Sequence, residues 1–379
     1  MTLLGPNKGR RSASALLAAL LLPKGRVALA ADRIVIGRSI ALSGPLRISG
    51  EAKRDGADAY IRRVNARGGI LGRAIEVVTL DDAYAPSTTV TNLRRLAAEH
   101  SPIAFLGLFG LPTSSAALPV LDQLRIPAIG LTSGASELRT PFKQFVFPVR
   151  ASFADEARKV VLHLKTLGIS RIAVAYTDNA FGEGVKTTTL ATIGDAGMGA
   201  TAVGIDAAGS NAPEAARRIV ASDPQVVVLA MANQAAVALV AQLRKAPYRG
   251  AMYAFSAVDA SIIGKQLGAE ARGLAITRVV PPPNTVQVRV VAEYLSAVRE
   301  LNGGAPSFFG LEGFLEAKVL VEGLRRAGPN PSATALIAGL ESMRDYDLGG
   351  FFVSYQPRQH TGSTFAEIDV VNASGGLTR

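Results

Sequence analysis

The chain has 379 residues, of which 48% are hydrophobic and 19% charged, with a formal net charge of +11 and no cysteine. This length exceeds what one ordinary core fills, so we expect two domains, and the composition is that of a globular rather than a disordered protein. The absence of cysteine excludes disulfides, thiolate nucleophiles, thiolate metal sites and a lipid anchor on an N-terminal cysteine.

The N-terminus has the layout of a secretory signal peptide, which we place at residues 1–30. Basic residues precede the apolar run "ALLAALLLP" (15–23), which is too short to cross a bilayer, and the small residues Ala28 and Ala30 follow it at a cleavage site. Two basic residues directly after the run leave a disordered or amphipathic start as the alternative. The pair Arg10-Arg11 leaves twin-arginine export open beside the general secretory route. We therefore expect an exported, soluble protein.

The charge of the remaining chain is moderate. Five of the positive charges lie in the N-terminal segment, which contains no acidic residue before Asp32, so the rest carries +6. Its Lys and Arg residues are scattered and are not interleaved with aromatic residues, so nucleic-acid binding is not expected. His100, His163 and His360 have no second histidine or carboxylate at metal-ligand spacing. We expect no metal and no cofactor.

From Asp32 onward, short apolar runs alternate with helical stretches. The runs predict buried strands at residues 34–40, 75–80, 103–108, 126–131, 172–176, 226–230, 252–255 and 274–280. Helices are predicted at residues 51–65, 87–100, 114–124, 154–167, 182–196, 213–221, 235–245, 286–301 and 308–327. This alternation predicts an α/β fold with parallel sheets and right-handed crossovers.

Two segments interrupt the alternation. The stretch "FVFPVRASFADE" (145–156) is extended, and "RVVPPPNTVQ" (278–287) contains three prolines that continue neither a ladder nor a helix. Both segments predict passages of the chain between domains. The helices that follow the second segment are too few to form a domain of their own. They complete the first domain, which requires a third passage near "GGFFVSYQP" (349–357). We therefore expect lobe 1 at residues 32–151 and 283–350, and lobe 2 at residues 152–282 and 351–379.

The stretch "NARGGILGRAIEVVTLDDAY" (65–84) joins a helix to a strand. Gly68 and Gly69 are suited to ending the helix and Gly72 to the turn before the strand. Asp81 and Asp82 then stand at the carboxyl end of the strand, the edge where open α/β sheets bind ligands. Turn chemistry and helix capping are the alternative role of the two aspartates.

The ordered set of these motifs resembles the type I periplasmic solute-binding proteins of the leucine/isoleucine/valine-binding family. In that family a strand, an "SG" loop, a long helix, "N..GG..G" and a strand ending in "DD" follow one another, as residues 36–90 do here. The resemblance continues through "IPAIGLTSGASELR", "RIAVAYTDNAFGEG" and "LGGFFVSYQPRQHTGS".

The resemblance implies two doubly wound parallel-sheet lobes joined by three crossovers, which close on a ligand by a hinge motion. It implies a monomer in the periplasm that captures a small-molecule solute and delivers it to ABC permease subunits in the inner membrane, with no bond made or broken.

The candidate ligand contacts in the first lobe are hydroxyls beside helix and strand ends. Thr113 and Ser114 stand where a helix begins, and Thr132, Ser133 and Gly134 follow a strand. In the resembled family these two loops hold the ligand's carboxylate, to which a helix N-terminus also contributes. Helix capping is the alternative.

Several positions depart from the family pattern. Leu111 falls where relatives often carry a ligand-binding Ser or Thr, and Phe181 falls where amino-acid-binding members have Tyr. Ser256 falls where leucine-binding members carry a carboxylate for the ammonium group. Because an unpaired buried ammonium is costly, an α-amino ligand would need another acceptor. Asp259, Asp178 and Asn233 are candidates in sequence, and each is equally suited to a cap or turn.

With Ser43 of the "SG" loop, these residues complete the candidate site. We expect a small solute with a carboxylate and an apolar body: a branched-chain or other hydrophobic amino acid, or an aromatic or aliphatic acid.

Two other classes of function are the alternatives. A nucleotide-dependent enzyme is not favoured, because no strand is followed by GxGxxG and "GEGVKT" (182–187) lacks the spacing of a phosphate-binding loop. There is also no Ser-His-Asp order around a serine elbow. A ligand sensor of the same fold remains open, since it would use the same hinge.

Overall fold

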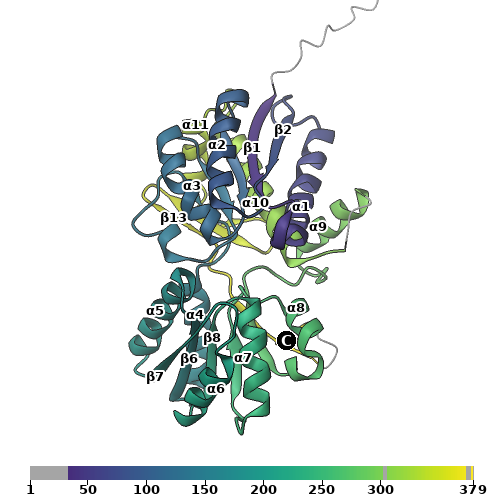
Figure 1. Cartoon of the computed structure of the whole chain (residues 1–379). Coiled ribbons are helices and arrows are strands. Elements are labelled where there is room, and N and C mark those ends of the chain that lie inside the picture. The colour runs from purple at the N-terminus through teal and green to yellow at the C-terminus, as the bar shows by residue number, and fades with distance from the viewer. Residues whose placement is uncertain (1–32, 302–304, 373–376, 379) are drawn as a thin grey trace, which may run out of the picture. The chain divides into compact units, whose positions relative to one another are not determined.

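A computed structural model of the chain describes residues 33–301, 305–372 and 377–378. The expected signal peptide lies outside these residues. From Asp32 onward the chain forms one compact unit (Figure 1). Among the described residues, no helix combines the length and the apolar character that a membrane crossing requires.

The first sheet contains the N-terminal strands in the order β2-β1-β3-β4-β5, all paired in parallel. Its strands are β1 (Ile34–Ile40), β2 (Ile75–Asp81), β3 (Ala104–Leu108), β4 (Ala128–Leu131) and β5 (Val146–Phe147). Alternate residues of β3 face opposite sides: Leu106 packs with α1 (Arg47–Ala66), α9 (Arg289–Glu300) and α10 (Phe308–Ala327), whereas Phe105 packs with α2 (Pro86–His100) and α3 (Leu111–Leu124). Helices therefore cover both faces, as the consecutive apolar residues of these strands require.

The second sheet repeats the arrangement in the order β7-β6-β8-β9-β10, and β14 and β15 extend it in antiparallel pairing. Its strands are β6 (Arg171–Thr177), β7 (Gly199–Ile205), β8 (Val226–Ala230), β9 (Ala251–Ala254), β10 (Leu274–Arg278), β14 (Glu367–Val371) and β15 (Leu377–Thr378). On one face lie α4 (Phe153–Thr166) and α5 (Ala180–Asp195). On the other lie α6 (Ala212–Ala221), α7 (Asn233–Lys245) and α8 (Ala260–Leu267).

Both parallel sets follow the same order, with the first strand in chain order lying between the second and the third. In each sheet the strand order reverses beside that first strand, and doubly wound sheets bind ligands at the carboxyl ends of strands near this reversal. The predicted fold class, two doubly wound lobes, is confirmed. Within the described residues the chain passes between the sheets after β5, after β10 and before β14, which gives the three expected crossovers.

We infer that the third passage lies later in the chain than the expected residue 350. Strands β11 (Tyr346–Asp347), β12 (Phe352–Gln356) and β13 (Gln359–Gly362) form a small antiparallel sheet. The Tyr355 hydroxyl donates to the Pro148 carbonyl, and Tyr355 belongs to the core of the first lobe. We therefore propose that the first lobe extends to about residue 362.

Helices α1 and α10 cross at close range on the first sheet. A Cβ atom on Gly56 would lie 1.8 Å from the carbonyl oxygen of Gly310. This approach brings buried Lys53 of α1 and Glu316 of α10 together, with Nζ 2.8 Å from Oε1.

Every predicted strand and helix has a counterpart within a few residues, and α2 begins at Pro86. Gly68, Gly69 and Gly72 have positive φ, as the helix end and turn require. Strand β7 was not predicted because most residues of its sequence "GATAVGI" have small side chains and are exposed at the edge of the sheet. Helix α11 (Ala333–Glu341), α8 and the β11–β13 sheet were also missed.

Candidate functional site

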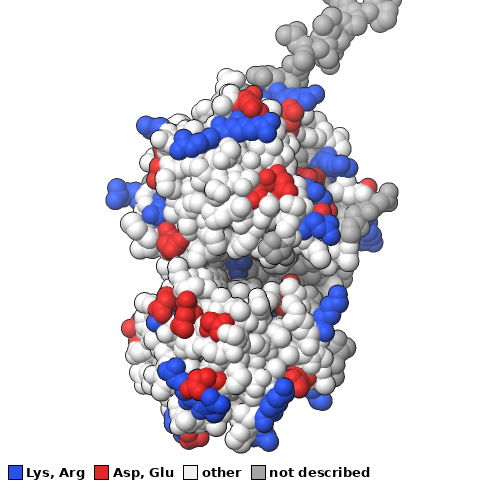
Figure 2. Space-filling model, viewed as in Figure 1, with Lys and Arg blue, Asp and Glu red and all other residues white. Residues whose placement is uncertain are grey.

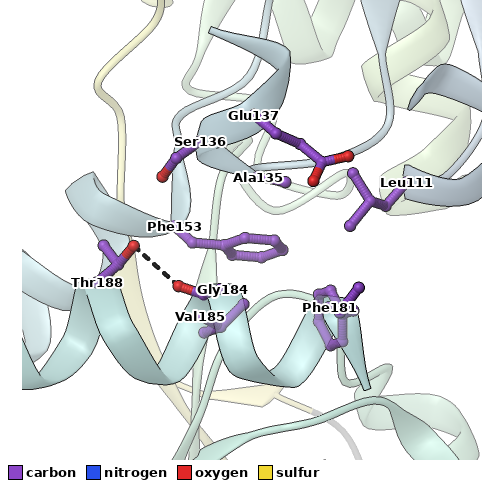
Figure 3. A pocket seen from close by; sticks show the side chains of 10 residues that line it. Leu111, Ala135, Ser136, Glu137, Phe153, Phe181, Gly184, Val185 and Thr188 are labelled. Atoms are coloured by element: carbon purple, nitrogen blue, oxygen red, sulfur yellow. Dashed lines mark hydrogen bonds between the residues drawn. The ribbon is translucent and has the colours of Figure 1, made fainter. Parts of the chain in front are cut away.

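A pocket of about 110 Å³ lies at the carboxyl ends of strands from both sheets (Figure 3). The first lobe contributes Leu111 at the start of α3 and Ala135, Ser136 and Glu137 from the loop after β4. The second lobe contributes Phe153 at the start of α4, and it contributes Ala180, Phe181, Gly184, Val185 and Thr188 from the start to the middle of α5. The pocket therefore forms where two lobes meet, at the edge that the topology predicts for a ligand.

Aromatic and aliphatic side chains make the walls. Figure 3 shows the Phe153 ring between Ala135 on one side and Val185 and Phe181 on the other. The rings of Phe153 and Phe181 meet edge to face with centroids 5.5 Å apart, and Phe255 lies 6.2 Å from Phe153. Such walls suit an apolar or aromatic ligand body.

The starts of α3, α4 and α5 border the same pocket, and that of α4 is closed by the capping box of Ser152 and Asp155. Helix α3 begins at Leu111 after Gly110, and no side chain caps it, so the backbone N–H groups of Leu111 and Thr113 have no intrahelical acceptor. Helix α5 begins at Ala180 and is capped by Asn179, which accepts from the Gly182 N–H at 2.9 Å. Helices α3 and α5 thus present the positive ends of their dipoles to the pocket, which favours a bound carboxylate.

The pocket also holds a carboxylate that the sequence analysis did not single out. Glu137 is exposed, accepts a hydrogen bond from the Ser115 hydroxyl, and turns its carboxylate toward Leu111 in Figure 3. It is an available acceptor for a ligand ammonium. Its position in the loop "SGASEL" gave no signal by itself, because only folding brings that loop against α3.

Of the sequence-predicted residues, Leu111 and Phe181 line the pocket. Thr113 and Ser114 lie beneath it: both are fully buried, and the Thr113 hydroxyl donates to the Phe109 and Gly110 carbonyls. The Ser114 hydroxyl is buried without a hydrogen-bond partner among the described residues.

The loop after β4 is held from several directions. Thr132 accepts a hydrogen bond from buried Lys53, and Ser133 accepts from the Ala135 N–H at 3.2 Å. Gly134 is adjacent to the second lobe: its carbonyl accepts from the Phe153 N–H at 2.8 Å, and a Cβ atom there would lie 2.7 Å from that nitrogen. These three residues thus shape the loop whose next residues line the pocket.

Ser256 is engaged in a buried ionic cluster. Its N–H and hydroxyl donate to Glu156 at 2.8 and 2.7 Å, and its hydroxyl accepts from Arg150. Arg150 lies in the first crossover, 3.6 Å from Glu156 of the second lobe and 3.8 Å from Glu312 of the first. Burial raises the pKa of Glu156, against the opposing effect of Arg150 and the hydrogen bonds.

The remaining candidates do not line this pocket. The Ser43 N–H donates to Asp81 at 3.2 Å, and Asn233 accepts from the Asp259 N–H at 2.7 Å. Asp178 packs against Gly204. Asp82 accepts from the Ser39 and Thr89 hydroxyls and from the Tyr84 N–H, so it supports the turn before α2, whose first N–H groups no side chain caps.

No group of three or more His, Asp or Glu side chains that could hold a metal ion is found in the described part of the chain. Charges of both signs are interspersed on the face shown in Figure 2.

Known proteins resemble this chain over most of its length. A family model described as periplasmic binding protein matches residues 33–376. An amino acid binding protein of Pseudomonas aeruginosa is 24% identical over 308 residues, which cover 80% of this chain and 81% of that protein. The crystal structure of an extracellular ligand-binding receptor from Verminephrobacter eiseniae is 28% identical with a TM-score of 0.84, covering 92% of this chain and 100% of that one. That of a substrate-binding periplasmic protein from Ralstonia solanacearum is 32% identical with a TM-score of 0.79, covering 91% and 99%.

Proposed function

The chain belongs to the periplasmic binding protein family, in the type I group that includes the leucine/isoleucine/valine-binding proteins, and we propose that it captures a small carboxylate-bearing apolar solute for an ABC importer. Proteins of this family bind solutes and are not enzymes. The family is periplasmic, and we extend that location to this chain.

One observation carries the proposal: the pocket is walled by Phe153 and Phe181 from one lobe and by Leu111 from the other, with the N-termini of α3 and α5 beside it. A carboxylate would take the backbone N–H groups at the start of α3, and the apolar body would lie against the rings. Closure of the lobes around the solute would then present one conformation to permease subunits, with the binding protein acting as a monomer.

An amino-acid solute would also need an acceptor for its ammonium group. Ser256 is committed to Arg150 and Glu156, so the acceptor for an amino group would be Glu137 at the pocket's rim. A hydrophobic amino acid, the class that the names of several relatives indicate, then has a partner for each of its charges. With a deamino acid bound, the Glu137 carboxylate would keep only its hydrogen bond from Ser115 and its contact with solvent.

The test is a thermal-shift and calorimetric panel on the chain that begins after residue 30. It contains leucine, valine and phenylalanine, their deamino analogues 4-methylpentanoate, 3-methylbutanoate and 3-phenylpropanoate, and the corresponding amino-acid amides. We expect stabilisation by acids and none by amides, because ligands that bind only the folded state raise its stability and the amides lack the carboxylate. Stabilisation by amides equal to that by acids would contradict the proposal, as would no response to any apolar acid.

A further inference from the structure

A second pocket, of about 400 Å³, lies beside the first crossover and shares no lining residue with the solute pocket. Three segments distant in sequence meet there: Arg139 after the loop that follows β4, Arg158 on α4, and Arg358 in the turn between β12 and β13. Asp155 and His360 also line it.

The Arg139 guanidinium donates to backbone carbonyls. Its Nη1 donates to the carbonyls of Ser133 and Ala135 at 3.2 Å, and its Nη2 donates to the Arg150 carbonyl at 3.1 Å. Its Nε is buried and has no hydrogen-bond partner, and no carboxylate of the described residues forms an ion pair with it. Burial, together with repulsion by Arg150, lowers its pKa to about 10, opposed by the nearby charge of Asp155.

The charge of the pocket is correspondingly positive. Arg158 is 60% exposed and pairs with Asp155 at 2.9 Å, and this aspartate also accepts from Ser152 at the start of α4. Arg358 is exposed and has positive φ, which fixes the tight turn that carries it. His360 is held by the Val146 carbonyl at 2.9 Å and by Glu341 at 3.1 Å. One carboxylate therefore faces three guanidinium groups among the residues that line the pocket.

We propose that this pocket binds a small oxyanion, a carboxylate or phosphate group, between the guanidinium groups of Arg139, Arg158 and Arg358. Guanidinium forks match both planar and tetrahedral oxyanions and bind them through charge-assisted hydrogen bonds. The volume accommodates a polycarboxylate or a phosphorylated metabolite as well as a single inorganic anion.

The site is connected to the solute pocket through one side chain. Arg139 holds the carbonyls of Ser133 and Ala135, and Ala135 lines the solute pocket. An anion bound at Arg139 therefore contacts the residue that positions the solute loop. Binding of the anion itself does not depend on the proposed solute.

The test is isothermal titration of the chain after residue 30 with inorganic phosphate and, separately, with citrate, at an ionic strength kept constant with sodium chloride. The double variant Arg158→Gln/Arg358→Gln removes the two exposed cations and leaves Arg139 in place. Its matched control is Arg95→Gln/Arg217→Gln, which removes two exposed arginines that pair with nearby acids on their own helices, as Arg158 does. Melting temperatures without anion verify that both variants fold.

We expect saturable binding to the unaltered chain, a loss of about tenfold or more in affinity in the first variant, and unchanged affinity in the control. Tighter binding of phosphate or of citrate identifies which group the site prefers. The proposal is overturned if neither anion binds saturably, if the two double variants bind equally, or if Phe181→Ala in the solute pocket abolishes anion binding.

Discussion

Arg150 and Glu156 form a nearly fully buried ion pair, with Nη2 3.6 Å from Oε1, at the point where the chain first passes between the lobes. Glu156 also accepts from the N–H and hydroxyl of Ser256 and from the Thr277 hydroxyl. The same guanidinium lies 3.8 Å from Glu312 of the first lobe. Arg150 is thus the shared counter-charge of carboxylates in both lobes.

Replacement of Arg150 by methionine is expected to lower the free energy of unfolding by about 3–5 kcal/mol, because it leaves Glu156 and Glu312 buried without their cation. Adding Glu156→Gln should restore part of the loss, since one uncompensated charge is then gone. Urea denaturation of the two single variants and the double variant measures this. Additive effects of the two substitutions would show that the pair does not interact.

Stability is expected to fall with rising pH because of Glu316. Burial raises its pKa to about 7, opposed by Lys53 and reinforced by Glu312. A carboxyl group whose pKa is higher in the folded than in the unfolded chain binds more protons when folded. Its contribution is fully present below about pH 4.5 and is lost as the pH rises through about 7.

Glu316→Gln should therefore flatten the pH dependence of unfolding between pH 5 and pH 8, by on the order of 3 kcal/mol. Glu99→Gln, at an exposed position of α2, is the control and should keep the slope of the unaltered chain. The slopes of stability against pH are compared, and not the stabilities themselves, because the substitution also lowers stability by leaving Lys53 without its carboxylate. Parallel curves for the Glu316→Gln variant and the unaltered chain would contradict the assignment.

Phe181→Ala is expected to weaken solute binding about tenfold or more, since it removes one aromatic wall of the pocket. The melting temperature without solute should change little, because Phe181 is only half-buried. Phe352→Ala removes an equally large ring that is 54% exposed on β12 and should leave affinity unchanged. Equal solute affinity in both variants would place the solute elsewhere.

Glu137→Gln separates amino acids from deamino acids. We expect about fivefold weaker binding of leucine or phenylalanine, the size of an exposed ion pair, and unchanged or tighter binding of 4-methylpentanoate. Calorimetry with the paired ligands measures the difference. If both ligand classes lose affinity to the same extent, Glu137 acts on the shape of the loop and not on the ammonium.

The sequence predicted the elements well where local signals decide them. Consecutive β-branched residues marked β1 and β8 to the residue, and the predicted start of α2 at residue 87 is one residue from the observed start at Pro86. The expected parallel pairing holds through β10. Strands β14 and β15 pair in antiparallel fashion, and they were not predicted from the sequence. The return of β12 and β13 to the first lobe depends on contacts such as Tyr355 with Pro148, more than 200 residues away.

The site shows the same division. The sequence by itself determined the α/β alternation, the glycine turns and the loops that reach the ligand edge, because helix ends, strand runs and positive φ depend on neighbouring residues. Only the tertiary structure decided that Thr113 and Ser114 are buried, that Ser256 is engaged by Arg150, and that Glu137 stands at the pocket. The physical reason is that burial and ion pairing are set by partners from distant segments, and no local pattern specifies which polar side chain faces the ligand.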